Sequence, residues 1–286
     1  MKTKNSAAGV LAAIGAIAIW GSSFILTKNL LNEGGPFTIN AIRLAIGLMV
    51  MLPLALRQGF KLSLLRNINI PLMALGMAVA FTFQNFGLQI TSASSTALIQ
   101  GGMPAMIAII AFGFMGEKAT PAKITGIILS VLGIILVTNN PSGSRVDSVA
   151  GNLLVIVSVI AWTFYTLQGK RVAGAASSLV ITTAVFIVTL LLLLPFTAWE
   201  IAAQGLPHFS TASLFILVYM GICASAVAFF LWNFTLSHLD TSVAGAFANL
   251  EPVVGMGFAI LLGEQAFMMQ MAGGAMAILG VWLCTL

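Results

Sequence analysis

Glu251 is the residue best suited to chemistry in this chain, because it is a lone acid within a largely apolar run, residues 241–262. Ionisable residues inside a membrane are rare and usually functional. Such a carboxyl group could take up and release protons, and so couple the movement of another solute to a proton gradient. The alternative is structural. Pro252 follows directly, and because a proline inside a helix removes a backbone hydrogen bond, the acid could bind the broken backbone instead.

Amide, hydroxyl and aromatic side chains recur within the other apolar runs, where polar groups are expected to face a cavity or a partner helix. Asn85 and Asn233 are separated along the chain by the same interval as Pro104 and Pro252. They could form two walls of one pocket, or serve only as hydrogen-bonding groups between helices. The candidate substrate-contacting residues are Trp20, Ser23, Phe24, Phe81, Gln84, Asn85, Thr96, Gln100, Trp162, Tyr165, Trp232, Asn233 and Asn249.

Basic residues within or at the ends of apolar runs need a role that tolerates their charge. Lys28 and Lys170 are expected to extend toward a membrane interface, since a long side chain can bury its stem and keep its ammonium group in water. Arg43 lies about a third of the way into the run 36–57. It is predicted to bind an anionic group or to pair with an acid or a helix C-terminus.

The types of residue needed for metal binding or covalent catalysis are sparse. His208 and His238 fall at the ends of apolar runs, without the partner spacing of a metal site. Hydrolysis or acyl transfer would need a nucleophile beside a base, and no such pair is evident. The sequence therefore predicts no metal, no cofactor and no enzymatic activity.

The elements that must position these residues follow from composition. The 286-residue chain is 59% hydrophobic and 7% charged, whereas a soluble domain carries about 25% charged residues. Runs of about 20 apolar residues can cross a hydrocarbon core. They fall at 9–31, 36–57, 70–90, 93–115, 120–139, 150–170, 177–199, 211–235, 241–262 and 266–286. The sequence predicts an all-α integral membrane protein with ten transmembrane helices.

Several short motifs of the first half recur in the second half in the same order. Phe86-Gly87-Leu88, Thr91-Ser92, Pro104 and Gly116-Glu117 return as Phe234-Thr235-Leu236, Thr241-Ser242, Pro252 and Gly263-Glu264. Further upstream, Trp20 and Lys28 match Trp162 and Lys170 at one common interval. The chain is predicted to divide into a first repeat over 1–140, an external linker over 141–149 and a second repeat over 150–286.

The orientation follows from the basic residues, which are enriched in cytoplasmic segments of membrane proteins. With the N-terminus inside, that side holds Lys2, Lys4, Arg57, Lys61, Arg66, Lys118, Lys123, Lys170 and Arg171. Both termini are therefore predicted to be cytoplasmic, in a cell inner (plasma) membrane. Since five helices is an odd number, the two halves would be inverted repeats around a central cavity.

Prolines and glycines in these runs have predicted mechanical roles. Pro104 and Pro252 are expected to kink their helices and let them bend during gating. Gly126 and Gly133 lie two helical turns apart in the run 120–139. Together with the equivalent pair in the last run, Gly273 and Gly280, they are expected to let the two helices pack closely at the back of the bundle.

The combined motifs resemble the drug/metabolite transporter superfamily, in its ten-helix EamA-like branch. They are Ala18–Phe24 with Lys28, Ala41–Leu44, Gly116-Glu117, Leu250–Val253 and Gly263-Glu264. The resemblance implies that helices 1, 3, 4, 6, 8 and 9 line the cavity and that helices 5 and 10 pack behind it. Met103 is the repeat equivalent of Glu251, so a mechanism with two acids is not expected.

We expect a secondary transporter for small amphipathic metabolites, most plausibly one that exports amino acids. A cavity rich in amides, hydroxyls and aromatic rings but nearly free of charge suits a zwitterionic or neutral compound. The alternatives are an exporter of aromatic cations that uses Trp20, Trp162 and Glu251, an intramembrane enzyme, and a receptor or assembly factor. The expected partners are a small-molecule substrate and the lipid bilayer, not nucleic acid, and the expected state is a monomer.

Overall fold

The computed structural model describes residues 6–91, 96, 99–100, 102–138, 148–251, 253–254 and 268–286, and every named element in them is a helix. The first half contains α1 (Ala7–Leu30), α2 (Pro36–Arg57), η1 (Leu62–Arg66), α3 (Asn69–Ile90), α5 (Met103–Phe114) and α6 (Pro121–Thr138). The second half contains α7 (Val149–Val172), α8 (Ser178–Gln204), α9 (Thr211–Tyr219), η2 (Met220–Val227), α10 (Ala228–His238), α11 (Thr241–Phe247), η3 (Ala248–Leu250) and α13 (Met268–Thr285).

The predicted apolar runs coincide closely with these helices, so the expectation of an all-helical fold is confirmed. The run 36–57 has the same bounds as α2, and the run 70–90 differs from α3 only at its first residue. Five described helices are long and apolar enough to cross a membrane. They are Pro36–Arg57, Asn69–Ile90, Val149–Val172, Ser178–Gln204 and Thr211–His238.

Pro104 lies at the start of a helix. α5 begins at Met103 and the proline occupies its first turn. Residues 96 and 99–100 of the same predicted run are also helical, so the bend expected near Pro104 stays a prediction. A proline is well accommodated there, since its missing N–H group would have no partner within the helix. Pro252 and residues 255–262 of the run 241–262 lie outside the described residues, so the kink expected there stays a prediction.

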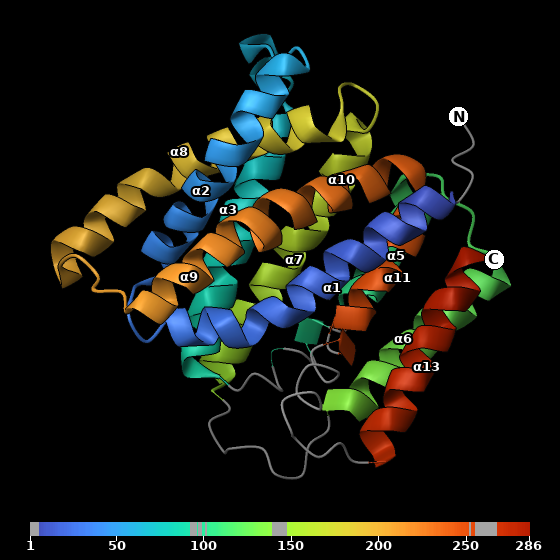
Figure 1. Ribbon diagram of the computed structural model, residues 1–286. Coiled ribbons are helices and arrows are strands. Elements are labelled where there is room, and N and C mark those ends of the chain that lie inside the picture. The colour runs from blue at the N-terminus through green and yellow to red at the C-terminus, as the bar shows by residue number, and fades with distance from the viewer. Residues whose placement is uncertain are drawn as a thin grey trace.

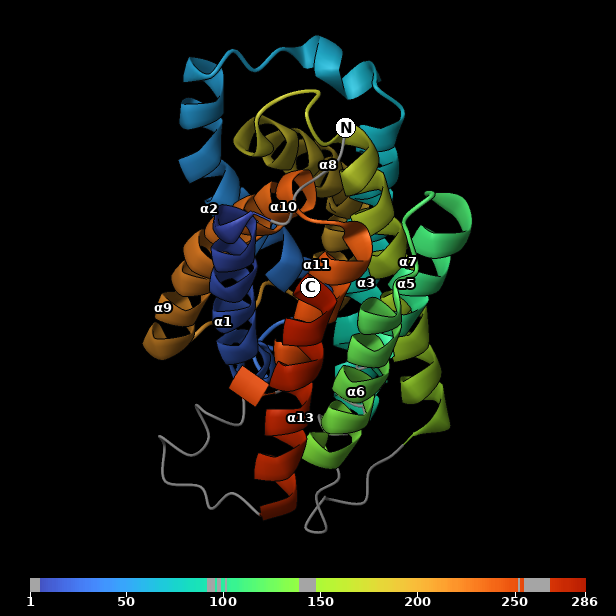
Figure 2. The ribbon, with the colours of Figure 1, turned by 90° about the vertical axis from the view of Figure 1, so that its right-hand side faces the viewer.

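Each half supplies one member of every major helix pair. α1 packs along α10, α2 along α8, α3 along α7, α5 along α11 and α6 along α13. Figure 1 shows α1 running beside α10, and both Figure 1 and Figure 2 show α6 and α13 side by side. The core is therefore made almost entirely of contacts between the two halves.

The α6–α13 pair depends on glycine, as the sequence predicted. A Cβ atom on Gly126 would lie 2.5 Å from the carbonyl oxygen of Gly280. One on Gly133 would lie 2.5 Å from the backbone nitrogen of Ala277 and 2.6 Å from the carbonyl oxygen of Gly273. The two backbones touch directly, which small residues allow.

Equivalent helices in the two halves begin in the same way. The hydroxyl of Ser6 accepts a hydrogen bond from the backbone N–H of Gly9 at the start of α1. Ser148, its equivalent in the second half, accepts the same bond from Gly151 at the start of α7. Serine is a preferred N-cap because its oxygen satisfies one of the free N–H groups of the first turn.

Candidate functional site

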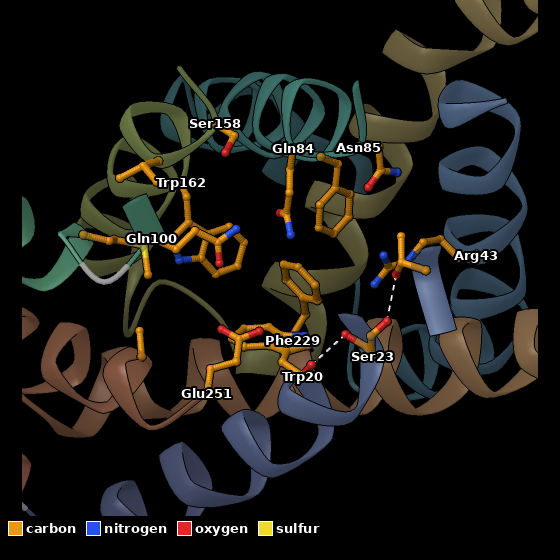
Figure 3. A pocket seen from close by; sticks show the side chains of 15 residues that line it. Trp20, Ser23, Arg43, Gln84, Asn85, Gln100, Ser158, Trp162, Phe229 and Glu251 are labelled. Atoms are coloured by element: carbon orange, nitrogen blue, oxygen red, sulfur yellow. Dashed lines mark hydrogen bonds between the residues drawn. The ribbon is translucent and has the colours of Figure 1, made fainter. Parts of the chain in front are cut away.

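A pocket lies at the centre of the helix bundle, between α1, α2, α3, α5, α7 and α10 (Figure 3). It has a cavity volume of about 70 Å³. The structure brings together these predicted residues in its wall: Trp20, Ser23, Phe81, Gln84, Asn85, Gln100, Trp162 and Glu251. Both halves of the chain contribute to it.

Other predicted residues do not line this pocket. Tyr165 and Trp232 are completely buried in the core, because their side chains pack against neighbouring rings. Asn249 donates a hydrogen bond to the hydroxyl of Ser130 at 2.9 Å, and so acts between helices. Thr96 is buried and lies outside the pocket, and the side chain of Phe24 is outside the described part of the chain.

Asn233 borders a different cavity. This second cavity, of about 620 Å³, lies at the ends of α7 and α10 and the start of α8, where it is also lined by Lys170, Ser177 and His238. Neither Tyr165 nor Trp232 lines either cavity. Of the predicted polar residues, Asn233 thus borders the second cavity, while Thr96 and Asn249 border neither.

Aromatic rings form one side of the central pocket. The ring centre of Trp20 lies 5.3 Å from that of Trp162 and 5.1 Å from that of Phe229, both in edge-to-face geometry.

The indole N–H of Trp20 donates a 2.9 Å hydrogen bond to the backbone carbonyl of Ala224. Ala224 lies in η2, a π-helical segment within the helical rod that runs from Thr211 to His238. Such segments alter the regular helical bonding and often occur at functional sites. Nothing in our sequence analysis predicted it.

Arg43 is the positive charge of the pocket. It is 6% exposed, and its Nε donates a 2.9 Å hydrogen bond to the hydroxyl of Ser225. Its guanidinium carbon lies 4.6 Å from the ring centre of Phe81, a cation–π arrangement. Among the described residues no acid pairs with it. The remaining N–H groups of the guanidinium can therefore bind an anionic group, one of the two roles predicted for this residue.

Glu251 is the acidic residue of the same pocket. Its carboxyl group points into the cavity in Figure 3. Along the chain, Glu251 directly follows the short 3-10 turn η3. In the part of the chain that the structure describes, the carboxyl group has neither an ion pair nor a hydrogen bond. The pocket thus has one basic and one acidic residue, which come from opposite halves of the chain, and its other walls are neutral side chains.

Lys170 lies in the last turn of α7, where it contacts the end of a neighbouring helix. Its ammonium group donates hydrogen bonds to the backbone carbonyls of Leu236, at 3.0 Å, and Leu239. These carbonyls lie at the end of α10, where helices leave acceptors without partners and where a positive charge is favourable. The lysine therefore joins α7 to the end of α10. The side chain of Lys28 is outside the described residues.

One further polar residue escaped the sequence analysis. Asn40 is fully buried, and its side-chain oxygen accepts a hydrogen bond from the amide of Asn85 at 3.2 Å. An asparagine within the apolar run 36–57 was the signal that could have identified it.

The model of the EamA-like transporter family matches residues 7–139 and again residues 149–286. The chain belongs to the EamA-like transporter family. The resemblance to the drug/metabolite transporter superfamily is confirmed with it. EamA-like proteins are transporters, and the apolar helices fit a multi-pass membrane protein.

Relatives of this EamA-like chain cover almost its whole length. An uncharacterized transporter of Archaeoglobus fulgidus is 26% identical over 98% of this chain and 98% of its own. A probable amino-acid metabolite efflux pump of Escherichia coli is 21% identical, over 96% and 93%. The aromatic amino acid exporter YddG of Ancylobacter novellus is 22% identical, over 92% and 90%. A solved crystal structure matches the fold with a TM-score of 0.82 at 19% identity, over 96% of this chain and 95% of the other.

Proposed function

We propose that this protein is a secondary transporter that exports small zwitterionic metabolites, amino acids above all. One observation carries the proposal: Arg43 and Glu251 line a single pocket without pairing with each other. Two opposite charges held apart complement the carboxylate and ammonium groups of an amino acid. Two relatives, named as a probable amino-acid metabolite efflux pump and an aromatic amino acid exporter, support the same substrate class.

In this proposal the carboxylate of the substrate binds the free N–H groups of Arg43, whose planar fork suits carboxylates. The ammonium group binds Glu251, and the side chain packs against Trp20, Trp162 and Phe229. Because Glu251 would hold either the ammonium group or a proton, it could couple export to proton entry. Gln84 and Gln100 supply hydrogen bonds from the remaining wall.

The proposed architecture is ten transmembrane helices in two inverted repeats, 1–140 and 150–286, joined by 141–149. The pairing of each first-half helix with a second-half helix supports it, as does the family match to both parts. The pocket between the halves would open alternately to the two sides. We place the protein in the inner membrane as a monomer, with both termini cytoplasmic, because the two repeats together complete the site.

Counterflow in proteoliposomes tests this proposal. Vesicles are loaded with L-leucine, L-threonine or L-phenylalanine, and uptake of the labelled amino acid is followed with and without a pH gradient. We expect saturable uptake by the wild type, about tenfold weaker uptake in Arg43→Met, and partial recovery in Arg43→Lys. Glu251→Gln should lose the response to the gradient, whereas the loop variant Glu33→Gln should keep it. The amino-acid assignment fails if the wild type shows no flux of any of the three.

A second candidate, an exporter of aromatic cations, is favoured by one observation. Trp20, Trp162 and Glu251 line the same pocket, and aromatic faces together with an acid can hold an organic cation. The buried charge of Arg43 opposes this assignment. Tetraphenylphosphonium in the same vesicles separates the two, since an exporter of cations would carry it and lose transport in Glu251→Gln.

A further inference from the structure

The central pocket lies beside two pairs of residues related by the sequence repeat. Trp20 and Trp162 form one pair, and Phe81 and Phe229 form the other. The members of each pair touch each other, with ring centres at 5.3 Å for the tryptophans and 5.6 Å for the phenylalanines. Equivalent residues of the two halves thus meet at the centre of the molecule, and their flanks can be compared directly.

The four rings form an aromatic centre, and the residues that adjoin it in each half form its two flanks. The two flanks differ in side-chain size. On one flank Tyr165 stacks on Trp162 at 5.0 Å, and Trp232 lies 5.6 Å from Trp20. Both are fully buried.

The equivalent positions on the other flank carry smaller side chains. Ser23 is three residues after Trp20, as Tyr165 is after Trp162, and Gln84 is three residues after Phe81, as Trp232 is after Phe229. Both Ser23 and Gln84 line the pocket. The pocket therefore occupies the space that a tyrosine and a tryptophan fill in the other half.

The hydrogen bonds behind the two flanks also correspond. Asn233 donates to the hydroxyl of Thr182 at 2.8 Å and to the phenol oxygen of Tyr165 at 3.0 Å. The repeat equivalents of Asn233 and Thr182 are Asn85 and Asn40, and Asn85 donates to Asn40 at 3.2 Å. The second half thus contains three hydrogen-bonded groups, which are the amide of Asn233, the hydroxyl of Thr182 and the phenol of Tyr165.

The first half contains the equivalent amide, Asn85, and the equivalent second polar residue, Asn40, but no phenol. The hydroxyl of Ser23 donates to the backbone carbonyl of Trp20 at 2.8 Å and makes no bond to Asn85. Asn85 faces the pocket, as Figure 3 shows. Behind it, the side-chain nitrogen of Asn40 is buried without a partner among the described residues. Buried amides normally have all their bonds satisfied. Asn85 uses one N–H for Asn40 and lines the pocket, so its remaining amide groups can bind a ligand there.

We propose that Asn85, supported by Asn40, binds the carboxylate of the transported substrate at the position where Asn233 binds the hydroxyl of Tyr165, and that the small size of Ser23 is what admits the substrate. This inference rests on the proposed function, because it assigns a subsite within the proposed substrate pocket. In the second half, the hydroxyl of Tyr165 occupies the position that the substrate carboxylate would occupy in the first half. Asn85 and Arg43 together would select substrates with a carboxylate over the corresponding amides.

Three substitutions of Ser23 test the proposal by thermal unfolding in detergent, each with and without L-leucine, L-threonine, L-phenylalanine or L-leucinamide. Ser23→Tyr supplies the missing phenol, Ser23→Phe supplies the ring alone, and Ser23→Ala keeps the space. We expect the wild type to be stabilised by the amino acids more than by L-leucinamide, and Ser23→Ala, which keeps the space, to depart from the wild type far less than Ser23→Tyr. Ser23→Tyr should lose that stabilisation and, without ligand, should melt several degrees above Ser23→Phe.

The comparison of the melting temperatures of Ser23→Tyr and Ser23→Phe needs no ligand. Asn85→Ala should weaken amino-acid binding about tenfold, and in combination it should remove the advantage of Ser23→Tyr over Ser23→Phe. If Ser23→Tyr still binds like the wild type, or melts no higher than Ser23→Phe, the proposal is overturned while the transport function stands. If the wild type binds none of the amino acids, the proposed function fails, and the ligand-free comparison still shows whether Asn85 can hold a phenol.

Discussion

Glu200 and Gln58, which are repeat equivalents in the two halves of the chain, hold opposite ends of one helix pair. Glu200, near the end of α8, accepts hydrogen bonds from the backbone N–H of Thr38 and from its hydroxyl, both at 2.7 Å, at the start of α2. Gln58, directly after α2, accepts a 2.6 Å hydrogen bond from the hydroxyl of Ser177, the N-cap of α8. The C-terminal end of each helix is thus hydrogen-bonded to the N-terminal end of the other.

The Glu200 contact should contribute more to stability than the Gln58 contact. Glu200 is 3% exposed and its charge lies at the positive end of α2, whereas the Gln58 bond is exposed to solvent. We expect Glu200→Ala to lower the free energy of unfolding by roughly 2 kcal/mol, since it leaves buried donors unpaired. Thermal unfolding in detergent measures this. Gln204→Ala, an exposed position at the end of the same helix, is the control, and an equal loss there would contradict the prediction.

The glycine contact between α6 and α13 makes a second prediction. Gly126→Ala would place a methyl group 2.5 Å from the carbonyl oxygen of Gly280, so the helices must separate. Overpacking of this kind costs about 1–3 kcal/mol. Gly113→Ala provides the control, because a Cβ atom there meets nothing within 4 Å. A melting temperature for Gly126→Ala equal to that of Gly113→Ala would show that this interface tolerates separation.

Glu117 joins the loop after α5 to the start of α11. Its carboxylate accepts hydrogen bonds from the backbone N–H groups of Thr241, at 2.6 Å, and Ser242, at 3.1 Å. We expect Glu117→Ala to cost about 1 kcal/mol, as loss of an N-terminal cap does. Hydrogen exchange should accelerate at the amides of Thr241 and Ser242. Unchanged exchange, or equal acceleration in the exposed neighbour Lys118→Ala, would count against this role.

A pH effect is expected at the loop that follows α1. The backbone N–H of Ser210 donates to Glu33 at 2.8 Å, and this bond, with those from the hydroxyls of Ser213 and Ser210, lowers the pKa of Glu33 from its usual 4.5. Because the folded-state pKa is the lower one, the contact stabilises fully above pH 4.5 and is lost as the pH falls through the lowered value. Hydrogen exchange at Ser210 against pH measures this loss. In Glu33→Gln the dependence should vanish, and its persistence would assign it to another group.

Much of the architecture follows from local sequence. Apolar runs of about 20 residues predicted the helices to within a few residues at α2, α3, α6 and α7, because chain length and hydrophobicity alone decide what can span a membrane. The pairs Trp20/Trp162 and Asn85/Asn233 were visible as repeats. Gly126 and Gly280 were recognisable as a packing stripe because helical spacing is regular. These features depend on residues near one another in the chain, or on comparison of one half with the other.

The composition of the pocket was decided only by the tertiary structure. The sequence by itself singled out Tyr165 and Trp232 as cavity residues, yet both rings are buried in the core. Only the structure shows that Arg43 and Glu251, from opposite halves, line the same pocket. Which face of a helix looks toward the cavity depends on how helices from different halves cross, and no local pattern encodes that. The sequence determined the helices and their repetition. Packing between the halves decided that one flank is filled by Tyr165 and that the other borders the central pocket.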